Sequence, residues 1–183
     1  LGPVPFRPRV ELVAVPARLP RRPEGTVGRD DDLSALSEWL GDAGLVTLVG
    51  PGGVGKTRLA VEAAYRQRSR FPGGVWFVDL TVISSTEATV GRVADEIAAV
   101  LELSPAPGVS SSQAVAQGLA ERQLLLVIDN CEHVLDSAAT VVEELMNQCP
   151  EVTFLATTRV PLEVPGEREF AVSPLADDQA VAL

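Results

Sequence analysis

The chain has 183 residues, of which 46% are apolar and 22% charged, and its formal net charge at pH 7 is −10. This length suits one α/β domain with appendages, and the composition excludes a disordered chain. The negative charge makes direct nucleic-acid binding by this segment a poor expectation. Because there is neither a membrane-length apolar run nor a signal peptide, we expect a cytoplasmic protein without membrane contact, and the start at Leu1 indicates a fragment of a longer chain.

Residues 1–25 differ from the rest of the chain because they are rich in proline and arginine. This composition is typical of an extended linker or docking arm, and contact with nucleic acid is the weaker alternative. The next segment, residues 26–173, is expected to form the folded domain. Its two cysteines, Cys131 and Cys149, are too few for a zinc site or a disulfide framework and predict reduced, partly buried thiols.

Helical and strand patterns alternate through this domain. The first helix begins with the acidic turn Asp30–Asp32, which suits a helix N-terminus, and carries leucines at helical spacing. Strands are predicted at 45–49, 75–80, 124–128, 152–156 and 169–172, and further helices at about 55–70, 90–101, 112–122 and 134–149, with a loop at 105–112. Such alternation predicts a five-stranded, parallel, doubly wound α/β sheet with helices on both faces.

The first strand is followed by a phosphate-binding motif. Gly50-Pro51-Gly52-Gly53-Val54-Gly55-Lys56-Thr57 matches G-x-x-x-x-G-K-[ST] at every fixed position. Lys56 is also the single lysine among 15 lysine and arginine residues, and its compact ammonium can reach between a β- and a γ-phosphate. Backbone N–H groups of such a loop form an anion nest at a helix N-terminus. The motif predicts a P-loop that binds a nucleoside di- or triphosphate.

Asp129 is the predicted partner of this loop. It ends the apolar strand at 124–128, and we expect it to hold Mg²⁺ together with the hydroxyl of Thr57, phosphate oxygens and water. The next residue is Asn130, where ATPases of the RecA and AAA-like branch usually have a second acid. Asparagine can orient water but cannot accept its proton, so we expect slow hydrolysis. Whether Glu132 or Asn130 positions the attacking water does not follow from spacing.

Two further side chains are candidates. Arg159 follows Thr157 and Thr158 at the predicted end of the fourth strand, the sheet edge where ligands lie in open α/β folds, and it could sense a γ-phosphate. His133, the single histidine, stands beside a predicted helix start, which favours a supporting position over a general base.

These motifs together resemble the STAND class of signal-transduction ATPases (NB-ARC or AP-ATPase relatives), as found in large bacterial transcriptional regulators. The stretches that carry the resemblance are residues 27–30, 46–58, 71–80, 125–133, 156–159 and 164–168. The resemblance implies that Val27, Gly28 and Arg29 hold adenine through backbone groups. It also implies that the loop from Gly50 to Arg58 binds the nucleotide and that Arg159 is the γ-phosphate sensor.

In that family, ADP-bound closed and ATP-bound open states, the latter often oligomeric, control effector domains that commonly bind DNA. The resemblance therefore implies other domains of the same polypeptide, an effector and a sensor, as partners. Thr26 stands where the family often has an aromatic residue, and residues 174–183 match only the start of the helical subdomain. Because the lid is missing, we expect this segment to bind nucleotide without switching fully.

Three classes of function remain open at this point. The first is a regulatory ATP/ADP switch, the second a dedicated kinase or motor ATPase, and the third a nucleotide-binding module that does not hydrolyse. A kinase would need an acceptor pocket and mobile arginine-bearing lids, of which the sequence shows no sign. A GTPase is excluded because its Asn-Lys-x-Asp guanine reader needs a second lysine.

Overall fold

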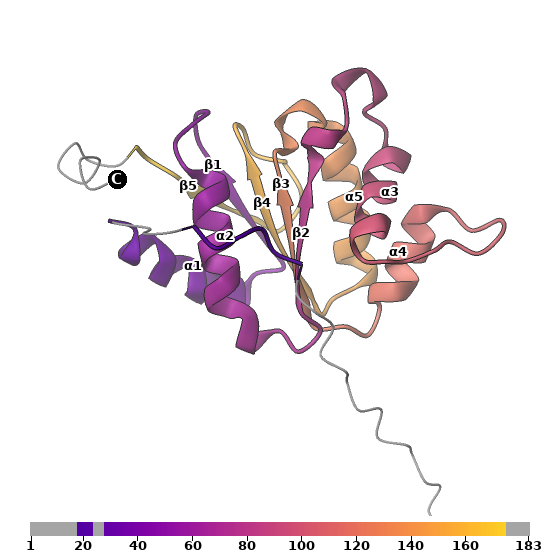
Figure 1. Ribbon diagram of the computed structural model, residues 1–183, viewed down its shortest axis with the longest axis horizontal. Helices are drawn as coiled ribbons and strands as arrows, with labels where there is room; N and C mark the ends of the chain where they lie inside the picture. The colour runs from indigo at the N-terminus through magenta and orange to yellow at the C-terminus, as the bar shows by residue number, and fades with distance from the viewer. Residues whose placement is uncertain (1–17, 24–27, 175–183) are drawn as a thin grey trace, which may run out of the picture.

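The structure, a computed structural model, describes residues 18–23 and 28–174. The strands are β1 (Leu45–Val49), β2 (Val75–Asp79), β3 (Leu124–Asp129), β4 (Val152–Thr158) and β5 (Glu167–Ala171). All of them run parallel in one sheet, in the order β2-β3-β4-β1-β5 (Figure 1). The strand of the predicted phosphate loop and the strand that ends in Asp129 are therefore separated by β4. Their carboxyl ends share one edge of the sheet.

Helices cover both faces of this sheet. They are α1 (Asp30–Asp42), α2 (Lys56–Gln67), α3 (Val90–Val100), α4 (Ser111–Leu119) and α5 (Leu135–Gln148). Single 3-10 turns lie at η1 (Arg68–Arg70), η2 (Leu80–Val82), η3 (Ser85–Glu87) and η4 (Cys131–His133). In Figure 1, α1 and α2 lie on one side of the sheet and α3, α4 and α5 on the other. The predicted α/β fold of P-loop type, with a doubly wound parallel sheet, is confirmed.

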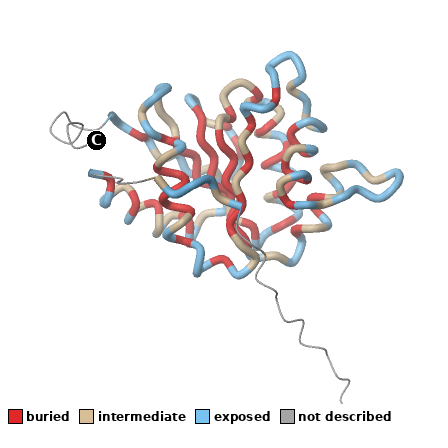
Figure 2. The backbone as a smooth tube through the Cα atoms, viewed as in Figure 1, coloured by how far each residue is buried: buried red, intermediate tan, exposed pale blue. Residues whose placement is uncertain are grey.

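The sheet separates two apolar cores. Along β3, Leu124, Leu126 and Ile128 pack toward α3–α5, and Leu125 and Val127 pack toward α1 and α2. Every residue of β3 is buried, and Figure 2 shows the burial concentrated in the central strands. A strand covered on both faces has no solvent side, which explains its unbroken apolar run. These cores fix the carboxyl end of β3, and with it the position of Asp129.

Several boundaries differ from the predicted ones. β4 extends past Ala156, so that Thr157 and Thr158 are strand residues and Arg159 alone follows the strand. β5 covers Glu167–Ala171 instead of 169–172, because its backbone pairs with β1 in that register although its side chains are mostly polar. α4 begins inside the predicted loop, because Ser110 and Gln113 form a capping box.

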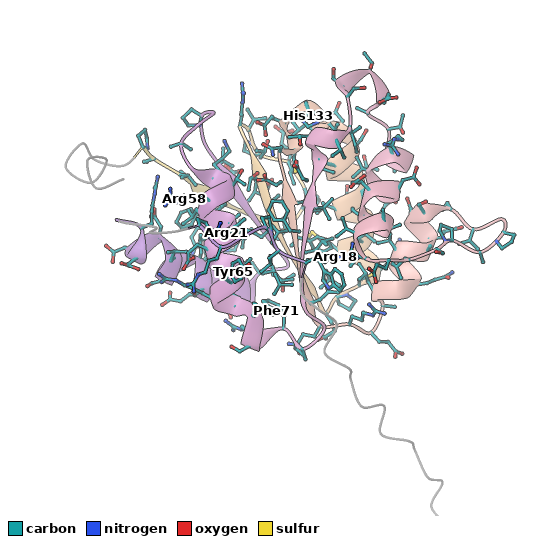
Figure 3. The ribbon with its side chains drawn as sticks, viewed as in Figure 1. Arg18, Arg21, Arg58, Tyr65, Phe71 and His133 are labelled. Carbon is teal, nitrogen blue, oxygen red and sulfur yellow. The ribbon has the colours of Figure 1, made fainter. Side chains whose placement is uncertain are left out.

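Residues 18–23, which we call the strap, lie along α2 and beside the outer strand β2. The Phe77 N–H donates to the Arg18 carbonyl at 3.0 Å, and the Tyr65 hydroxyl donates to the Pro20 carbonyl at 2.9 Å. Arg22 donates twice to Glu62 of α2, at 3.0 and 2.8 Å. Figure 3 labels Arg18, Arg21 and Tyr65 along this path. The rest of the predicted arm, Val27 and residues 175–183 lie outside the described residues.

Among the residues that the structure describes, no helix combines the length and the apolar character needed to cross a membrane.

Candidate functional site

The loop between β1 and α2 takes its shape from glycine. Gly53 and Gly55 have φ angles of 79° and 95°, in the left-handed region that other residues rarely adopt. A Cβ added at either position would meet nothing within 4 Å, so the backbone angle and not crowding requires glycine there. Gly55 is also the N-cap of α2, whose first N–H groups therefore open onto the loop. This arrangement gathers backbone donors and the positive helix end at one point, which suits a phosphate.

Lys56 is the first residue of α2 and is only 8% exposed. Its Nζ donates to the carbonyls of Gly50 at 2.8 Å and Pro51 at 3.0 Å. The ammonium is thus held inside the curve of the loop, where a bound phosphate could replace the carbonyls as its acceptor. The polar contacts of the side chain are thus with atoms of the loop itself.

Thr57 and Asp129 meet at the carboxyl edge of the sheet. The Thr57 hydroxyl lies 2.8 and 3.0 Å from the two carboxylate oxygens of Asp129. Thr157 of the intervening strand β4 donates to the same carboxylate at 2.5 Å. Burial raises the pKa of Asp129, the two hydroxyl donors oppose the rise, and the charges of Asp79 and Glu132 add to it. A cation placed here would offset the cost of this buried carboxylate.

The donors at this point fit Mg²⁺. A hydroxyl and a carboxylate are hard oxygen ligands, and Mg²⁺ usually keeps several water and phosphate ligands besides one or two from the protein. Within residues 18–23 and 28–174, no group of three or more His, Cys, Asp or Glu could hold a metal ion. The residues therefore suit an ion that arrives with a phosphate, and not a metal centre made of protein alone.

Asn130 also serves this carboxylate. It stands in the left-handed region, with φ 61°, and its N–H donates to the Thr157 hydroxyl at 3.0 Å. Its side-chain amide donates to Asp129 at 2.8 Å and lies 3.4 Å from Asp79. The amide hydrogens of Asn130 are thus directed at carboxylates, which positions Asp129 and leaves Asn130 without a way to take up a proton.

Arg159 and Glu132 form an ion pair beside the loop. The Arg159 Nε lies 3.4 Å from Glu132 Oε1, and the other carboxylate oxygen is buried without a hydrogen-bond partner in the described structure. A Cβ added to Gly52 would lie 3.3 Å from Arg159 Nη2, so the guanidinium lies against the phosphate loop. Sequence spacing alone could not show this contact, because it joins residues from the ends of different strands.

Arg29 braces the opposite side of the loop. Its buried guanidinium donates to the Val54 carbonyl at 3.1 Å, to the Ser173 carbonyl at 2.7 Å and to Asp32 at 2.9 Å. Its own carbonyl accepts the first helical bond of α1, from Leu33. Arg29 therefore ties α1, the loop and the segment after β5 together, a structural role that sequence reasoning did not predict.

A cavity of about 460 Å³ lies between the strap and the outer side of the loop. Its lining residues are Pro20, Arg21, Pro23, Gly53, Gly55, Thr57, Arg58 and Val61. This volume is within the usual range for small-molecule pockets. The cavity is continuous with the loop that holds Lys56, so a ligand with a phosphate in the loop has room for a further group here.

Two residues of the site, Asp79 and Thr157, were not singled out from sequence as site residues, whereas His133 lies in the supporting position that was expected. Asp79 ends β2 directly opposite Asp129 in the sheet register, and its signal was an apolar strand that ends in an acid, the same that indicated Asp129. Thr157 had no such signal. His133 lies in a supporting position, since its Nε2 contacts the Leu80 and Ile83 carbonyls at 2.8 and 2.9 Å and so ties η4 to the segment after β2 (Figure 3).

Comparison with known proteins places this site in a family. Residues 40–170 match the AAA domain family. A Mycobacterium tuberculosis protein named "Putative HTH-type transcriptional regulator Rv0890c" is 43% identical over 76% of this chain, which spans 15% of that protein. The regulatory protein AfsR of Streptomyces coelicolor is 30% identical over 92% of this chain, which spans 18% of it. The chain therefore corresponds to a small part of these much longer relatives.

Solved structures share the fold. The Walker-type ATPase PABY2304 of Pyrococcus abyssi gives a TM-score of 0.66 at 15% identity, over 90% of this chain and 59% of that one. The STAND protein PH0952 of Pyrococcus horikoshii, which has a tetratricopeptide-repeat sensor, gives a TM-score of 0.58 at 19% identity. The match covers 92% of this chain and 26% of that one. Together with the regulators above, these matches confirm the resemblance that the sequence motifs indicated. The family match spans β1 to β5, the phosphate loop and Asp129, and this chain belongs to the AAA domain family of P-loop ATPases.

Proposed function

We propose that this domain binds Mg-ATP and Mg-ADP, hydrolyses ATP slowly, and acts as a regulatory switch in a multidomain bacterial transcriptional regulator. The observation that carries the proposal is the contact of the Thr57 hydroxyl with Asp129, 2.8 Å long, at the mouth of the loop that holds Lys56. A hydroxyl, a carboxylate and an ammonium at one point are what a magnesium-bound polyphosphate requires.

Each residue has a definite role in this proposal. The backbone of Gly50–Gly55 holds the phosphates, Lys56 exchanges its carbonyl contacts for phosphate oxygens, and Arg159 reports the γ-phosphate. Thr57 and Asp129 would hold Mg²⁺, which when bound neutralises charge on the β- and γ-phosphate oxygens. Asn130 keeps Asp129 in place through its amide.

The nucleoside is assigned to the strap side of the loop. The cavity of about 460 Å³ there is lined by Pro23 of the strap and by Arg58 of α2. We propose that Val27, Gly28 and Arg29 contribute backbone contacts to adenine, with Arg29 also fixing the loop through the Val54 carbonyl. Val27 itself lies outside the described residues.

The regulatory role rests on the relatives. Two of them are named as regulators, and this chain spans less than a fifth of each. We propose that effector and sensor domains of the same polypeptide are the partners of this domain, and that its ATP-bound form assembles with further copies. We propose that the strap couples such an effector to α2, because Arg22 of the strap donates two hydrogen bonds to Glu62 of α2.

The decisive experiment measures nucleotide binding. Isothermal titration calorimetry with Mg-ATP and Mg-ADP should register binding by the folded protein, and Lys56→Ala should weaken it at least about 100-fold, because two or more charge-assisted hydrogen bonds to phosphate are lost. Arg92→Ala, an exposed change on α3, is the control and should bind normally. Equal affinity in wild type and Lys56→Ala would refute the proposed site.

Nucleotide content separates the switch from its alternatives. Freshly purified protein is denatured, and the released nucleotide is identified. Retained ADP together with turnover below about 1 per second supports the switch. Rapid turnover supports a dedicated catalyst. Retained ATP that does not decay supports the non-hydrolysing module, which the amide of Asn130 beside Asp129 favours.

A further inference from the structure

The carboxylate of Glu132 lies in the site but has no part in the proposed binding of phosphate, metal or nucleoside. Its side chain is 23% exposed, Oε1 pairs with Arg159 at 3.4 Å, and Oε2 is buried and accepts no hydrogen bond from the described residues. A buried carboxylate oxygen without a donor is costly, and it persists where the surrounding structure holds it in place.

Glu132 lies beside the phosphate loop, to which Arg159 connects it. Its partner Arg159 lies against Gly52, within the loop, and follows β4, the strand between the loop strand and β3. Its charge is also close enough to Asp129 to contribute to the raised pKa of that carboxyl. Glu132 is therefore near both the loop and Asp129.

The backbone around Glu132 is fixed on both sides. Cys131 is fully buried, and its thiol contacts the Ile128 carbonyl at 3.5 Å. His133 is anchored by the Leu80 and Ile83 carbonyls. With both neighbours held, the 3-10 turn keeps the Glu132 carboxylate in one place, as a group that acts on a substrate atom requires.

The other two carboxylates at this edge already accept hydrogen bonds, Asp79 through Oδ1. Asp129 accepts from Thr57, Thr157 and Asn130. Asp79 accepts from the Thr81 N–H at 2.9 Å and from the Thr81 hydroxyl at 2.7 Å. Asn130 carries a side-chain amide, which is not a base and cannot take up a proton from water. Glu132 Oε2 is buried and accepts no hydrogen bond from the described residues, so it retains the capacity to accept one.

We propose that Glu132 is the general base of ATP hydrolysis in this domain, in place of the acid that Asn130 replaces. Glu132 Oε2 accepts a proton from the attacking water while the water oxygen bonds to the γ-phosphorus. The bond from that phosphorus to the β–γ bridging oxygen breaks, and its electron pair leaves with ADP. The products are ADP and inorganic phosphate, and the proton passes from Glu132 to solvent.

Arg159 sets when this base is available. While it pairs with Glu132, the guanidinium holds Oε1 and keeps the carboxylate charge compensated. A γ-phosphate in the loop would compete for the same guanidinium, because it carries more charge than the carboxylate and the guanidinium lies against Gly52. The pair thus links γ-phosphate recognition to release of the base.

The test compares Glu132→Gln with wild type and with Glu151→Gln, an exposed change at the opposite edge of the sheet. Single-turnover hydrolysis of Mg-ATP, Mg-ATP affinity by calorimetry and the thermal midpoint are measured for each protein. We expect Glu132→Gln to hydrolyse about 10²–10⁴-fold more slowly, because glutamine cannot take up the proton. Its affinity and midpoint should match wild type, it should be purified with ATP bound, and Glu151→Gln should behave as wild type.

The outcomes separate this inference from the function on which it rests. If wild type fails to bind Mg-ATP, the proposed function is wrong and the inference falls with it. If wild type binds and hydrolyses while Glu132→Gln hydrolyses at the same rate, the inference alone is wrong. It is also overturned if wild type binds ATP without cleaving it, or if Glu132→Gln loses affinity and stability together, which would indicate a structural role.

Discussion

Asp129 illustrates how one residue carries opposite demands on stability and function. Its carboxylate is 2% exposed, and burial raises its pKa, so in the absence of a cation its charge costs free energy. Four hydrogen-bond distances of 2.5 to 3.0 Å, from Thr57, Thr157 and Asn130, offset part of that cost. The proposed metal ion would offset the remainder, and a site that is costly without its ligand is common in binding proteins.

We therefore expect Asp129→Asn to leave the free energy of unfolding without nucleotide unchanged or raised by about 1 kcal/mol, because a buried charge is removed. Mg-dependent nucleotide binding should fall sharply in the same variant. Urea denaturation measures the first effect, and calorimetry with and without Mg²⁺ the second. A large loss of stability would show that Asp129 serves the fold and not a metal.

The two cysteines give a second prediction at this scale. Cys131 and Cys149 are fully buried, and burial raises the pKa of both thiols, with the charge of Asp129 adding to the effect at Cys131. We expect neither to react with iodoacetamide in the folded protein, and both to react in urea, because the thiolate is the reactive form. Mass spectrometry reads the result. Alkylation of either thiol under native conditions would contradict this placement.

Helix α2 connects the phosphate loop to the strap through one side chain. Glu62 is buried, and its hydrogen bonds with Arg22, more than those with Arg66, hold its pKa below the ordinary value. A lowered pKa in the folded state means that the ionised form stabilises the fold. This contribution is complete above the pKa of the unfolded chain, about 4.3, and is lost as the pH falls through the lower folded-state pKa.

We expect Glu62→Gln to lose about 1 kcal/mol at pH 7, a modest value because Arg22 and Arg66 are more than a third exposed and solvent screens them. As the pH falls below the unfolded-state pKa and through the lower folded-state pKa of Glu62, wild type should lose this advantage, so the two urea midpoints should converge. Glu143→Gln, an exposed change on α5, is the control, and its urea midpoint should equal that of wild type at pH 7 and in acid. If the urea midpoints of wild type and Glu62→Gln stay apart in acid, the ionised form of Glu62 is not what stabilises the fold.

At the scale of elements, the sequence predicted the cores better than the edges. β1 was located to the residue and β3 to within one, because strands covered on both faces leave continuous apolar runs. β5 was misplaced by two residues, since an edge strand such as Glu167–Ala171 is defined by its backbone pairing with β1. The strap was not foreseen as a docked segment, because Arg22 and Glu62 are 40 residues apart.

The candidate site likewise has residues that the sequence predicted and contacts that it did not. Lys56, Thr57 and Asp129 were predicted, because their motif records a local geometry of loop and strand end. The order of the strands places β4 between the loop and Asp129, and no local pattern encodes this order. The contacts that depend on it, those of Thr157 with Asp129 and of Arg159 with Glu132, therefore emerged only from the folded chain.

For the molecule as a whole, the proposed function predicts stabilisation by ligand. Mg-ADP at about 100 times its Kd should add ~2.7 kcal/mol to the free energy of unfolding and raise the thermal midpoint by roughly 5–10 °C. Differential scanning fluorimetry reads this shift, and Lys56→Ala at the same nucleotide concentration should not show it. A shift of equal size in both proteins would mean that nucleotide binds elsewhere.

The docked strap also limits how copies of this domain can join. An exposed outer strand is a template on which an incoming chain can extend a sheet. Here the Phe77 N–H of β2 already donates to the Arg18 carbonyl, so the strap occupies part of that margin. The opposite margin is β5, whose charged residues Glu167, Arg168 and Glu169 discourage adventitious pairing. Filament growth through continuous sheets is thereby disfavoured.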